Sequence, residues 1–409
     1  MAGSDDVSTK DSEDYLANLQ VNFDISNVEN VDQFSPRELV MVESLLTPGL
    51  QTSLSFDSYL HKPVKDFNDF KNANIKVKIK RPVLARFGYV DNIEFNATIY
   101  RLQNRHLINN NNENLVFQAC HYTLLEDARH LISKPWKCTT PSAIVEQVLS
   151  ECTGAQNLDI ESSGPARDYS AQNIHPFQVV NQQADVALAA GTDPSFIHYM
   201  TYENDGTHHF RSLYSLTKQS PMMEFSYSEA GNNLDFEASW KNPHSIMTYS
   251  FPCDFDLLSD LLNGIDTNGN FIGTGIFQNP RNTLSSALNF TPGACSIGTT
   301  LKIASTNTNT AQDQLACNTD TESHLLLRQA RMGLLEQDKI ALRLTVPWNP
   351  NLHAGKVIKI NLWSKDVKDA LLYGSGNYLI HTMTHTVKAG GMSSTTMDCV
   401  STTVGQGIQ

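Results

Sequence analysis

Apolar and polar residues alternate along much of the chain. At residues 19–25 every second position is apolar, which is typical of a half-buried β-strand because successive strand side chains point to opposite faces. At residues 75–80 one face is β-branched and the other is a row of lysines, which is either solvated or matched to an acidic neighbouring strand. Similar patterns predict strands at residues 95–99, 196–202, 210–216, 342–346, 356–362, 378–387 and 394–403.

Residues 35–46 fit two patterns. A Ser-Pro-Arg-Glu capping box with Pro36 at the first helical position would start a helix. Val40 and Val42 are β-branched, however, and Thr-Pro-Gly at residues 47–49 is typical of a hairpin turn before a return strand. We favour the strand.

Two short amphipathic helices are predicted between the strands. The first has Thr140 as its N-cap and Pro141 as its first residue, and it ends before Gly154. The second starts at Pro176 and ends at Gly191. Both need a packing partner for their apolar stripes, because isolated short helices are marginal in water. The stripes are Ile144, Val145, Val148, Leu149 and Cys152 in the first helix, and Phe177, Val180, Ala184 and Ala187 in the second, with Val186 as a further candidate.

One long region differs from the rest in composition. Residues 263–319 hold four charged residues among 57 and are rich in Asn, Thr, Ser and Gly, which indicates an insertion or an extended arm. A helical pattern at residues 325–335 separates this region from the last strands. The order β-rich, helical, β-rich predicts a mainly β, α+β fold. Two antiparallel barrels or sandwiches flanking a small helical element fit this order better than one large sheet.

Length, composition and charge limit the class of protein. With 409 residues, 40% hydrophobic and 18% charged, the chain is expected to form two or three domains. Its formal charge of −13 repels nucleic acid. No apolar run approaches the ~20 residues that cross a bilayer, so no membrane segment is expected. The acidic residues 1–16 are expected to be a disordered leader without a secretory signal. The seven scattered cysteines include no CxxC motif and are interpreted as reduced thiols.

No sequence pattern predicts an enzyme. The nucleophile-elbow, Walker, zincin and dinucleotide-binding motifs are missing from the sequence. Carboxylate pairs such as Asp254 with Asp256, or Asp5 with Asp6, arise by chance in acidic chains, so we predict no glycosidase. We therefore expect no catalytic residue and no cofactor.

Histidine pairs and one acidic loop were weighed as metal ligands. His381 and His385 have i,i+4 spacing, but on a strand they would stand ~13 Å apart. His208 and His209 are expected to be partly exposed turn residues that point in opposite directions. The loop from Asp266 lacks the central glycine and final carboxylate of an EF-hand. We predict no metal site.

Several patterns taken in order resemble a known family. Arg167, Tyr169 and Gln172 form an Arg-x-Tyr-x-x-Gln stretch between a helical region and later strands. This order resembles the central hub protein of contractile phage baseplates, and it is similar to the hub part of contractile secretion-system spike proteins. The segments that carry the resemblance are residues 43–49, 117–129, 141–149, 164–173, 193–203, 209–213, 352–360 and 375–385.

The resemblance implies a homotrimer with two tube-like antiparallel β-barrel domains per chain. The corresponding domains are a first barrel at 17–125, a small two-helix domain at 126–192, and a second barrel at 193–409 with a polar insertion at about 225–320. Three chains would present six similar modules to a hexameric tail tube and would hold a trimeric central spike on the opposite side.

The implied partners follow from that arrangement. They are the tail tube protein, the central spike protein and other baseplate proteins, in a virion tail assembled in the host cytoplasm. An acidic channel would let DNA pass without specific binding during ejection.

Two other functions remain open at this level. One is a non-catalytic, β-rich, glycan-binding tail adhesin, and a weaker one is a glycan-cleaving enzyme on a β scaffold. An adhesin would gather aromatic side chains on one surface. The tryptophans, however, are spread along the chain at Trp136, Trp240, Trp348 and Trp363, which favours the hub.

Overall fold

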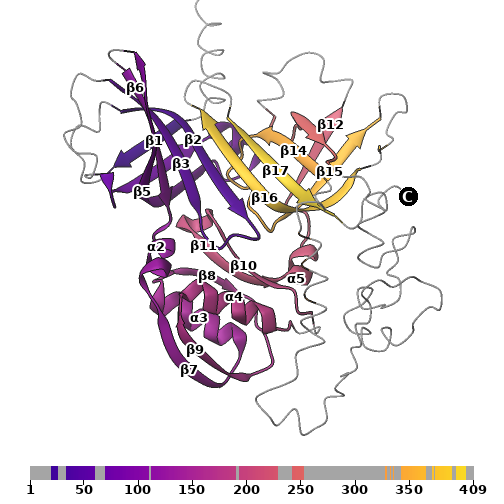
Figure 1. Cartoon of the computed structure of the whole chain (residues 1–409). Helices are drawn as coiled ribbons and strands as arrows, with labels where there is room; N and C mark the ends of the chain where they lie inside the picture. The colour runs from indigo at the N-terminus through magenta and orange to yellow at the C-terminus, as the bar shows by residue number, and fades with distance from the viewer. Residues whose placement is uncertain are drawn as a thin grey trace, which may run out of the picture.

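A computed structural model of the chain shows an extended β-sheet with an α/β segment packed on one side of it (Figure 1). The residues that it describes are 20–25, 34–59, 70–109, 112–189, 193–228, 242–252, 342–364, 371–372, 374–388 and 393–401, together with positions 328, 332 and 335.

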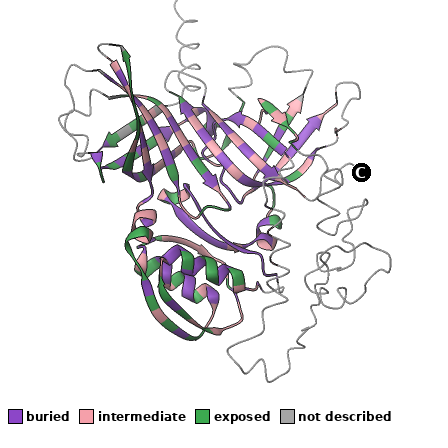
Figure 2. Ribbon diagram, viewed as in Figure 1, coloured by how far each residue is buried: buried purple, intermediate pink, exposed green. Residues whose placement is uncertain are grey.

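The first β part is made of strands in which buried and exposed positions alternate (Figure 2). In β4 the isoleucine and valine side chains are buried and the lysines face outward. Glu94 of β5 forms ion pairs with Lys76 and Lys78, with N–O distances of 2.6 and 3.3 Å. The lysine row is therefore matched to an acidic neighbour. The strands of this part are β1 (Gln20–Ile25), β2 (Phe34–Ser44), β3 (Gln51–Tyr59), β4 (Asn74–Lys80), β5 (Asn92–Asn109) and β6 (Asn112–Cys120).

The second β part is built from strands late in the chain. Its members are β12 (Met223–Ser228), β13 (Thr248–Ser250), β14 (Leu342–Pro347), β15 (Val357–Trp363), β16 (Gly376–Lys388) and β17 (Ser394–Val400). The pairing of β12 with β15 is parallel, and the other pairings within this part are antiparallel.

The two β parts are joined into one sheet at β2 and β16. These strands pair antiparallel, in register from Thr382 opposite Ser44 to Lys388 opposite Glu38. The result is a 12-stranded sheet with the order β1-β4-β5-β6-β3-β2-β16-β17-β14-β13, in which β15 also pairs with β16. Most buried apolar side chains of each part nevertheless form a cluster of their own, although Trp348 and Val387 of the second part belong to the cluster of the first. A mainly β fold is thus confirmed, whereas its division into two barrels stays a prediction.

The α/β segment lies between the two β parts in sequence and on one side of the sheet in space (Figure 1). It contains a three-stranded sheet, β10-β11-β8, and a two-stranded sheet, β7-β9. Its elements are α2 (Tyr122–Arg129), β7 (Ile132–Thr139), α3 (Pro141–Cys152), β8 (Asn157–Ile160), β9 (Arg167–Ile174), α4 (Pro176–Val186), β10 (Phe196–Thr201), η4 (Glu203–Asp205), β11 (Thr207–Ser212) and α5 (Leu213–Thr217). One further short helix, η3 (Pro82–Phe87), connects β4 to β5.

The two predicted helices are confirmed as α3 and α4, which pack against each other. The stripe of α3 is buried at Ile144, Val145, Val148 and Leu149, in a cluster that also contains the apolar face of α4. α4 ends at Val186, earlier than predicted.

The strand interpretation of residues 35–46 is also confirmed, because these residues belong to β2. β2 pairs with β3 on one side and with β16 on the other, so its backbone groups are used by the sheet and the capping-box pattern starts no helix. The predicted strand at 210–216 is wrong after Ser212. There the Ser212 hydroxyl accepts a hydrogen bond from the Ser215 N–H and caps α5.

Two further expectations concern cysteines and membranes. Cys138 is disulfide-bonded, so the interpretation of all seven cysteines as reduced thiols is wrong at this position. Cys120, Cys152 and Cys399 carry free thiols. Among the helices of the described ranges, none is long and apolar enough to cross a membrane.

Three predictions lie outside the described residues. They are the disordered leader at 1–16, the polar region at 263–319, and nearly all of the helical pattern at 325–335.

Candidate functional site: the junction of the three parts

A single carboxylate connects the first β part, the α/β segment and the second β part. Glu43 lies near the end of β2, and its side chain is completely buried. It accepts hydrogen bonds from the backbone N–H of Tyr202 at 2.8 Å, from the backbone N–H of Ala354 at 2.7 Å, and from His353 Nδ1 at 3.0 Å. Because these partners come from distant parts of the chain, Glu43 fixes where the three parts meet.

The charge of Glu43 is stabilised by its partners. Burial by itself would raise the pKa of this carboxyl, but His353 and the Tyr202 N–H together hold it below its ordinary value. The carboxylate can only accept hydrogen bonds, so Nδ1 of His353 carries the proton that it donates to Glu43.

Tyr202 strengthens the contact between the α/β segment and the first β part. Its hydroxyl donates to the backbone carbonyl of Gln51 at 2.9 Å and lies 2.8 Å from Thr52 Oγ1. Its ring packs on Phe95, with 4.8 Å between the ring centroids. Burial raises the pKa of the Tyr202 hydroxyl, which is therefore protonated at neutral pH.

The connection between β4 and β5 is held by the second β part. The buried Arg81 guanidinium donates to the backbone carbonyl of Trp348 at 2.7 Å. Burial lowers the pKa of Arg81 to about 10, so it is still charged at neutral pH. Nearby, the Asn351 amide donates to the Val90 carbonyl at 2.8 Å, and its Oδ1 accepts from the Val90 N–H at 3.1 Å. The two β parts are thus linked by side chains as well as by the β2–β16 ladder.

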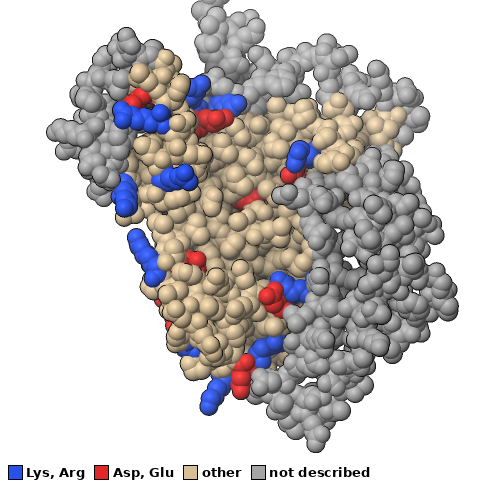
Figure 3. All heavy atoms as spheres, viewed as in Figure 1, with Lys and Arg blue, Asp and Glu red and all other residues tan. Residues whose placement is uncertain are grey.

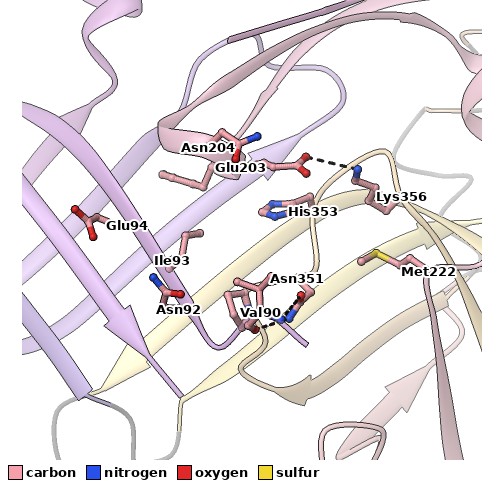
Figure 4. A pocket seen from close by; sticks show the side chains of 12 residues that line it. Val90, Asn92, Ile93, Glu94, Glu203, Asn204, Met222, Asn351, His353 and Lys356 are labelled. Atoms are coloured by element: carbon pink, nitrogen blue, oxygen red, sulfur yellow. Dashed lines mark hydrogen bonds and ion pairs between the residues drawn. The ribbon is translucent and has the colours of Figure 1, made fainter. Parts of the chain in front are cut away.

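A pocket of about 420 Å³ opens at this junction. Its walls come from the first residues of β5, from η4, from Met222, and from residues 350–356 (Figure 4). The His353 imidazole lies in the wall between Asn204 and Asn351, and its side chain is 7% exposed. Beside it, Glu203 forms an ion pair with Lys356 at 3.5 Å.

A second buried polar cluster lies inside the α/β segment. His198 Nε2 of β10 and His208 Nδ1 of β11 are 3.0 Å apart, and His208 Nε2 lies 3.1 Å from Thr123 Oγ1. The Thr123 hydroxyl also lies 2.8 Å from His121 Nδ1. The ring of Phe177 in α4 contacts both His198 and His208 edge-on. Burial lowers the pKa of His198 to about 3 and that of His208 well below its ordinary value, so both are neutral.

The prediction for the histidine pair at 208–209 is therefore right about the directions of the side chains and wrong about their exposure. The two side chains do point in opposite directions, since His209 bonds Asp159 Oδ2 at 2.8 Å and stacks on Tyr199. Both are buried, however, in β11 and not exposed at a turn. β11 is the central strand of its small sheet, so both of its edges are paired, by β10 and by β8. The Phe177 ring contacts His208, and the Tyr199 ring stacks on His209.

His381 and His385 both lie in β16, as the strand interpretation predicted. They have separate partners, Thr382 Oγ1 and Thr395 Oγ1, each at 2.8 Å from the Nδ1 atom. Within the described part of the chain, no group of three or more His, Cys, Asp or Glu side chains could hold a metal ion. The absence of a metal stays a prediction. Asp266, Asp254, Asp256, Asp5 and Asp6 lie outside the described residues.

No sequence pattern marks Glu43, Arg81, His198 or His353 as a candidate site residue. Glu43 could have been found once residues 35–46 were assigned to a strand. Leu39, Met41 and Glu43 share the buried face of β2, so a charge stands where an apolar residue is expected. A buried carboxylate requires donors, although the sequence does not say which residues supply them.

Comparisons with known proteins add the fold class. No family model and no curated protein matches the chain. Among solved structures, a 43 kDa tail protein of prophage MuSo2 from Shewanella oneidensis matches with a TM-score of 0.53 and 8% identity, over 94% of this chain and 97% of that one. A tail protein from Neisseria meningitidis MC58 matches with a TM-score of 0.51 and 9% identity, over 95% and 98% of the two chains.

A third solved structure is an E. coli component of the type VI secretion system, described as similar to the T4 bacteriophage tail proteins gp27 and gp5. It has a TM-score of 0.49 and 11% identity, over 93% of this chain and 76% of that one. From the two matches with higher TM-scores, the chain has the fold of these two tail proteins, one of which comes from a prophage. The resemblance found in the sequence is confirmed at this level.

Proposed function

We propose that this chain is the structural central hub of a contractile-tail baseplate. In this role it joins the hexameric tail tube to the trimeric central spike and forms part of the channel for DNA ejection. The observation that carries the proposal is the continuous sheet formed where β2 pairs with β16. It places two β parts with largely separate cores side by side in one chain.

Such a chain suits a connector between sixfold and threefold partners. Three copies with two β modules each present six modules to a hexameric tube, while keeping threefold symmetry for a trimeric spike. We assign the modules to residues 17–125 and 193–409, with the α/β segment, centred on residues 126–192, on one side. The junction around Glu43 would keep the two modules at a constant angle under the load of tail contraction.

Charge supports passage of DNA without specific binding. The formal charge of the chain is −13. On the face shown in Figure 3, lysines and arginines of the described residues are interspersed with acidic side chains. Phosphate contacts supply most of the non-specific affinity for DNA, so this balance favours release.

A glycan-binding adhesin is the second candidate, and the tryptophans argue against it. Trp348 is fully buried and Trp136 is 7% exposed. Trp363 is only partly exposed, and Trp240 lies outside the described residues. The described tryptophans thus offer no exposed stacking platform for a sugar.

A catalytic role is not favoured by the pocket. Glu43 and His353 resemble a carboxylate–imidazole pair of the kind that serves as a general base. Among the residues that line the pocket, Tyr202 is the one with a hydroxyl, and this hydroxyl is engaged by Gln51 and Thr52. We therefore propose a structural, non-enzymatic role.

The test is the oligomeric mass and shape of the purified chain. Light scattering is expected to give three times the 45.5 kDa chain mass, at least at high concentration or with a spike partner. Electron micrographs are expected to show rings with a central channel. A chain that stays monomeric at all concentrations, with the spike protein present, would refute the hub.

A further inference from the structure

The two β parts repeat one strand order. In the first part the strands β2 to β6 lie in the sheet as β4-β5-β6-β3-β2. In the second part the strands β13 to β17 lie as β15-β16-β17-β14-β13. All of these neighbours pair antiparallel. The sixth strand differs, since β1 pairs antiparallel with β4 whereas β12 pairs parallel with β15. β5 therefore corresponds to β16, and β2 corresponds to β13.

Local geometry repeats where the long strands β5 and β16 extend past their shorter neighbours. The last residues paired with β4 and β15 are Thr98 and Leu379. The isoleucine that follows exchanges two backbone hydrogen bonds with the two residues before the shorter strand, and the next residue is skipped in the pairing with β6 or β17. The bonded residues are Ile99 with Asn72 and Ala73, at 3.0 and 2.9 Å, and Ile380 with Gly355 and Lys356, both at 2.9 Å. The correspondence thus holds residue by residue.

Opposite residues carry this correspondence across the sheet. The first row starts just after the skipped residue of β5 and crosses β6, β3 and β2 through Arg101, Gln118, Ser53 and Val40. The matching row starts in β16 and crosses β17, β14 and β13 through Thr382, Asp398, Arg343 and Ser250. Val40 of β2 therefore has Ser250 of β13 as its counterpart.

Within one chain, the half of β16 that extends past β15 is paired with β2. Thr386 of β16 lies opposite Val40. On its other side Thr386 pairs with Ser394 of β17, and the matching position of β6, Asn114, pairs with His106 of β5. His106 is therefore the counterpart of Thr386.

The corresponding half of β5 has an open edge. Among the described strands, residues 100–109 pair with β6 alone, and Thr248–Ser250 of β13 pair with β14 alone. Leu107 and Ile108 on this half of β5 are 57% and 48% exposed. A strand edge that exposes apolar side chains is a template for pairing with another chain.

We propose that the open half of β5 in one copy pairs antiparallel with β13 of the next copy, as β16 pairs with β2 inside each chain. Replacing each strand by its counterpart sets the register, with His106 opposite Ser250 and Leu107 opposite Tyr249 of the neighbouring copy. β5 lies toward one end of the sheet and β14, the neighbour of β13, toward the other (Figure 1). The contact is therefore head-to-tail and can be repeated from copy to copy.

The number of copies, three in a ring, rests on the proposed function, whereas the contact rests on the internal repeat. A second copy is the occupant that the repeat favours, because it uses the open edges of β5 and β13 together and has a defined register. A strand of a different protein would use one of these edges and leave the other open.

The experiment is disulfide cross-linking of the full chain. Directly opposite residues of antiparallel strands have Cα atoms about 5 Å apart, within the reach of a disulfide. His106 and Ser250 are both exposed, so the double variant His106→Cys with Ser250→Cys is expected to fold. After oxidation with diamide, it is expected to give linked chains on a denaturing gel, above the background of the unchanged chain.

The matched control is out of register by four residues. The double variant Asn104→Cys with Thr248→Cys also changes exposed residues of β5 and β13. In the proposed pairing these two positions stand ~13 Å apart along the strands, so no linked chains are expected.

A second pair of variants tests the apolar contact. Leu107→Asp places a charge on the open edge and is expected to weaken association of the chains at least about tenfold. Leu131→Asp changes a leucine between α2 and β7 that is 54% exposed, and it is expected to associate as the unchanged chain does. Light scattering across a dilution series measures both, and circular dichroism checks that both are folded.

Three results would overturn the proposal. They are no linked chains from the in-register variant at any concentration, equal linking in both double variants, and equal association of Leu107→Asp and Leu131→Asp. Linked chains whose native mass is not that of three chains would support the contact and refute the trimeric hub. An unlinked trimer would refute the contact and leave the hub standing, so the two failures are distinguishable.

Discussion

Glu43 and His353 are separated by 310 positions in the chain, yet the Glu43 Oε1 and His353 Nδ1 atoms lie 3.0 Å apart in a buried hydrogen bond. The same carboxylate holds the Tyr202 and Ala354 backbone N–H groups. One side chain of β2 therefore satisfies donors from the α/β segment and from the second β part. A buried charge is stable only with such a full set of partners, so the position of each part depends on the others.

The first prediction is that Glu43→Gln destabilises the whole chain. The amide keeps the shape of the side chain, but its NH₂ group faces at least one N–H donor and the charge of the pair with His353 is lost. We expect a loss of about 3 kcal/mol, within the range for removal of one partner from a buried ion pair. The measurement is the guanidinium unfolding midpoint. Glu151→Gln serves as the exposed control, and equal midpoints for the two variants would show that Glu43 does not fix the junction.

Much of the local structure follows from short-range pattern. The alternation of apolar and polar residues predicted β1, β4, β14 and β16, because a strand with one buried face has an apolar residue at every second position. The β-branched Val40 and Val42 indicated β2 correctly against a capping box, since strand pairing decides whether the cap is used. Proline at the first position located α3 and α4.

The junction could not be predicted in the same way. The β2–β16 ladder and the partners of Glu43 are contacts between residues hundreds of positions apart, and no local pattern encodes them. Burial of His208 likewise depends on distant residues, because its Nε2 atom lies against Thr123 of α2 and its ring against Phe177 of α4. Gln147 of α3 illustrates the same limit on the helix surface. It lies outside the predicted apolar stripe, yet its Oε1 accepts a hydrogen bond from Trp136 Nε1 at 2.8 Å.

The second prediction concerns the core of the α/β segment. Val148 of α3 is 1% exposed, so Val148→Asp buries a carboxylate without partners and is expected to cost about 3 kcal/mol or more. Glu146→Gln, on the exposed side of the same helix, is expected to change stability by less than about 0.5 kcal/mol. Thermal unfolding compares the two variants. Under the proposed hub function, tails made with Val148→Asp are also expected to lack baseplates. Equal stability of both variants would contradict the packing of α3.

The third prediction is that the protein holds no stoichiometric metal. His381 and His385 have separate threonine partners, and His208 and His209 point in opposite directions. Elemental analysis of protein purified without a tag is expected to find no zinc, iron or calcium at one ion per chain. One bound ion per chain would instead point to ligands outside the described residues.

The last prediction is loss of stability in mild acid, caused by buried neutral histidines. Burial lowers the pKa of His198 to about 3 and that of His385 to about 4, from the ordinary 6.5. Because each of these pKa values is lower in the folded chain than in the unfolded chain, the unfolded chain binds more protons in acid. The contribution of each histidine to the free energy of unfolding is therefore fully present above pH ~6.5 and is lost as the pH drops below it. Each such histidine lowers the free energy of unfolding by about 2 kcal/mol at pH 5. The thermal midpoint is measured at pH 7 and pH 5. The difference between the midpoints at the two pH values is expected to be smaller in His198→Leu than in the unchanged chain. It is expected to stay the same in His106→Asn, which replaces an exposed histidine. An equal difference in both variants would exclude His198 as a cause.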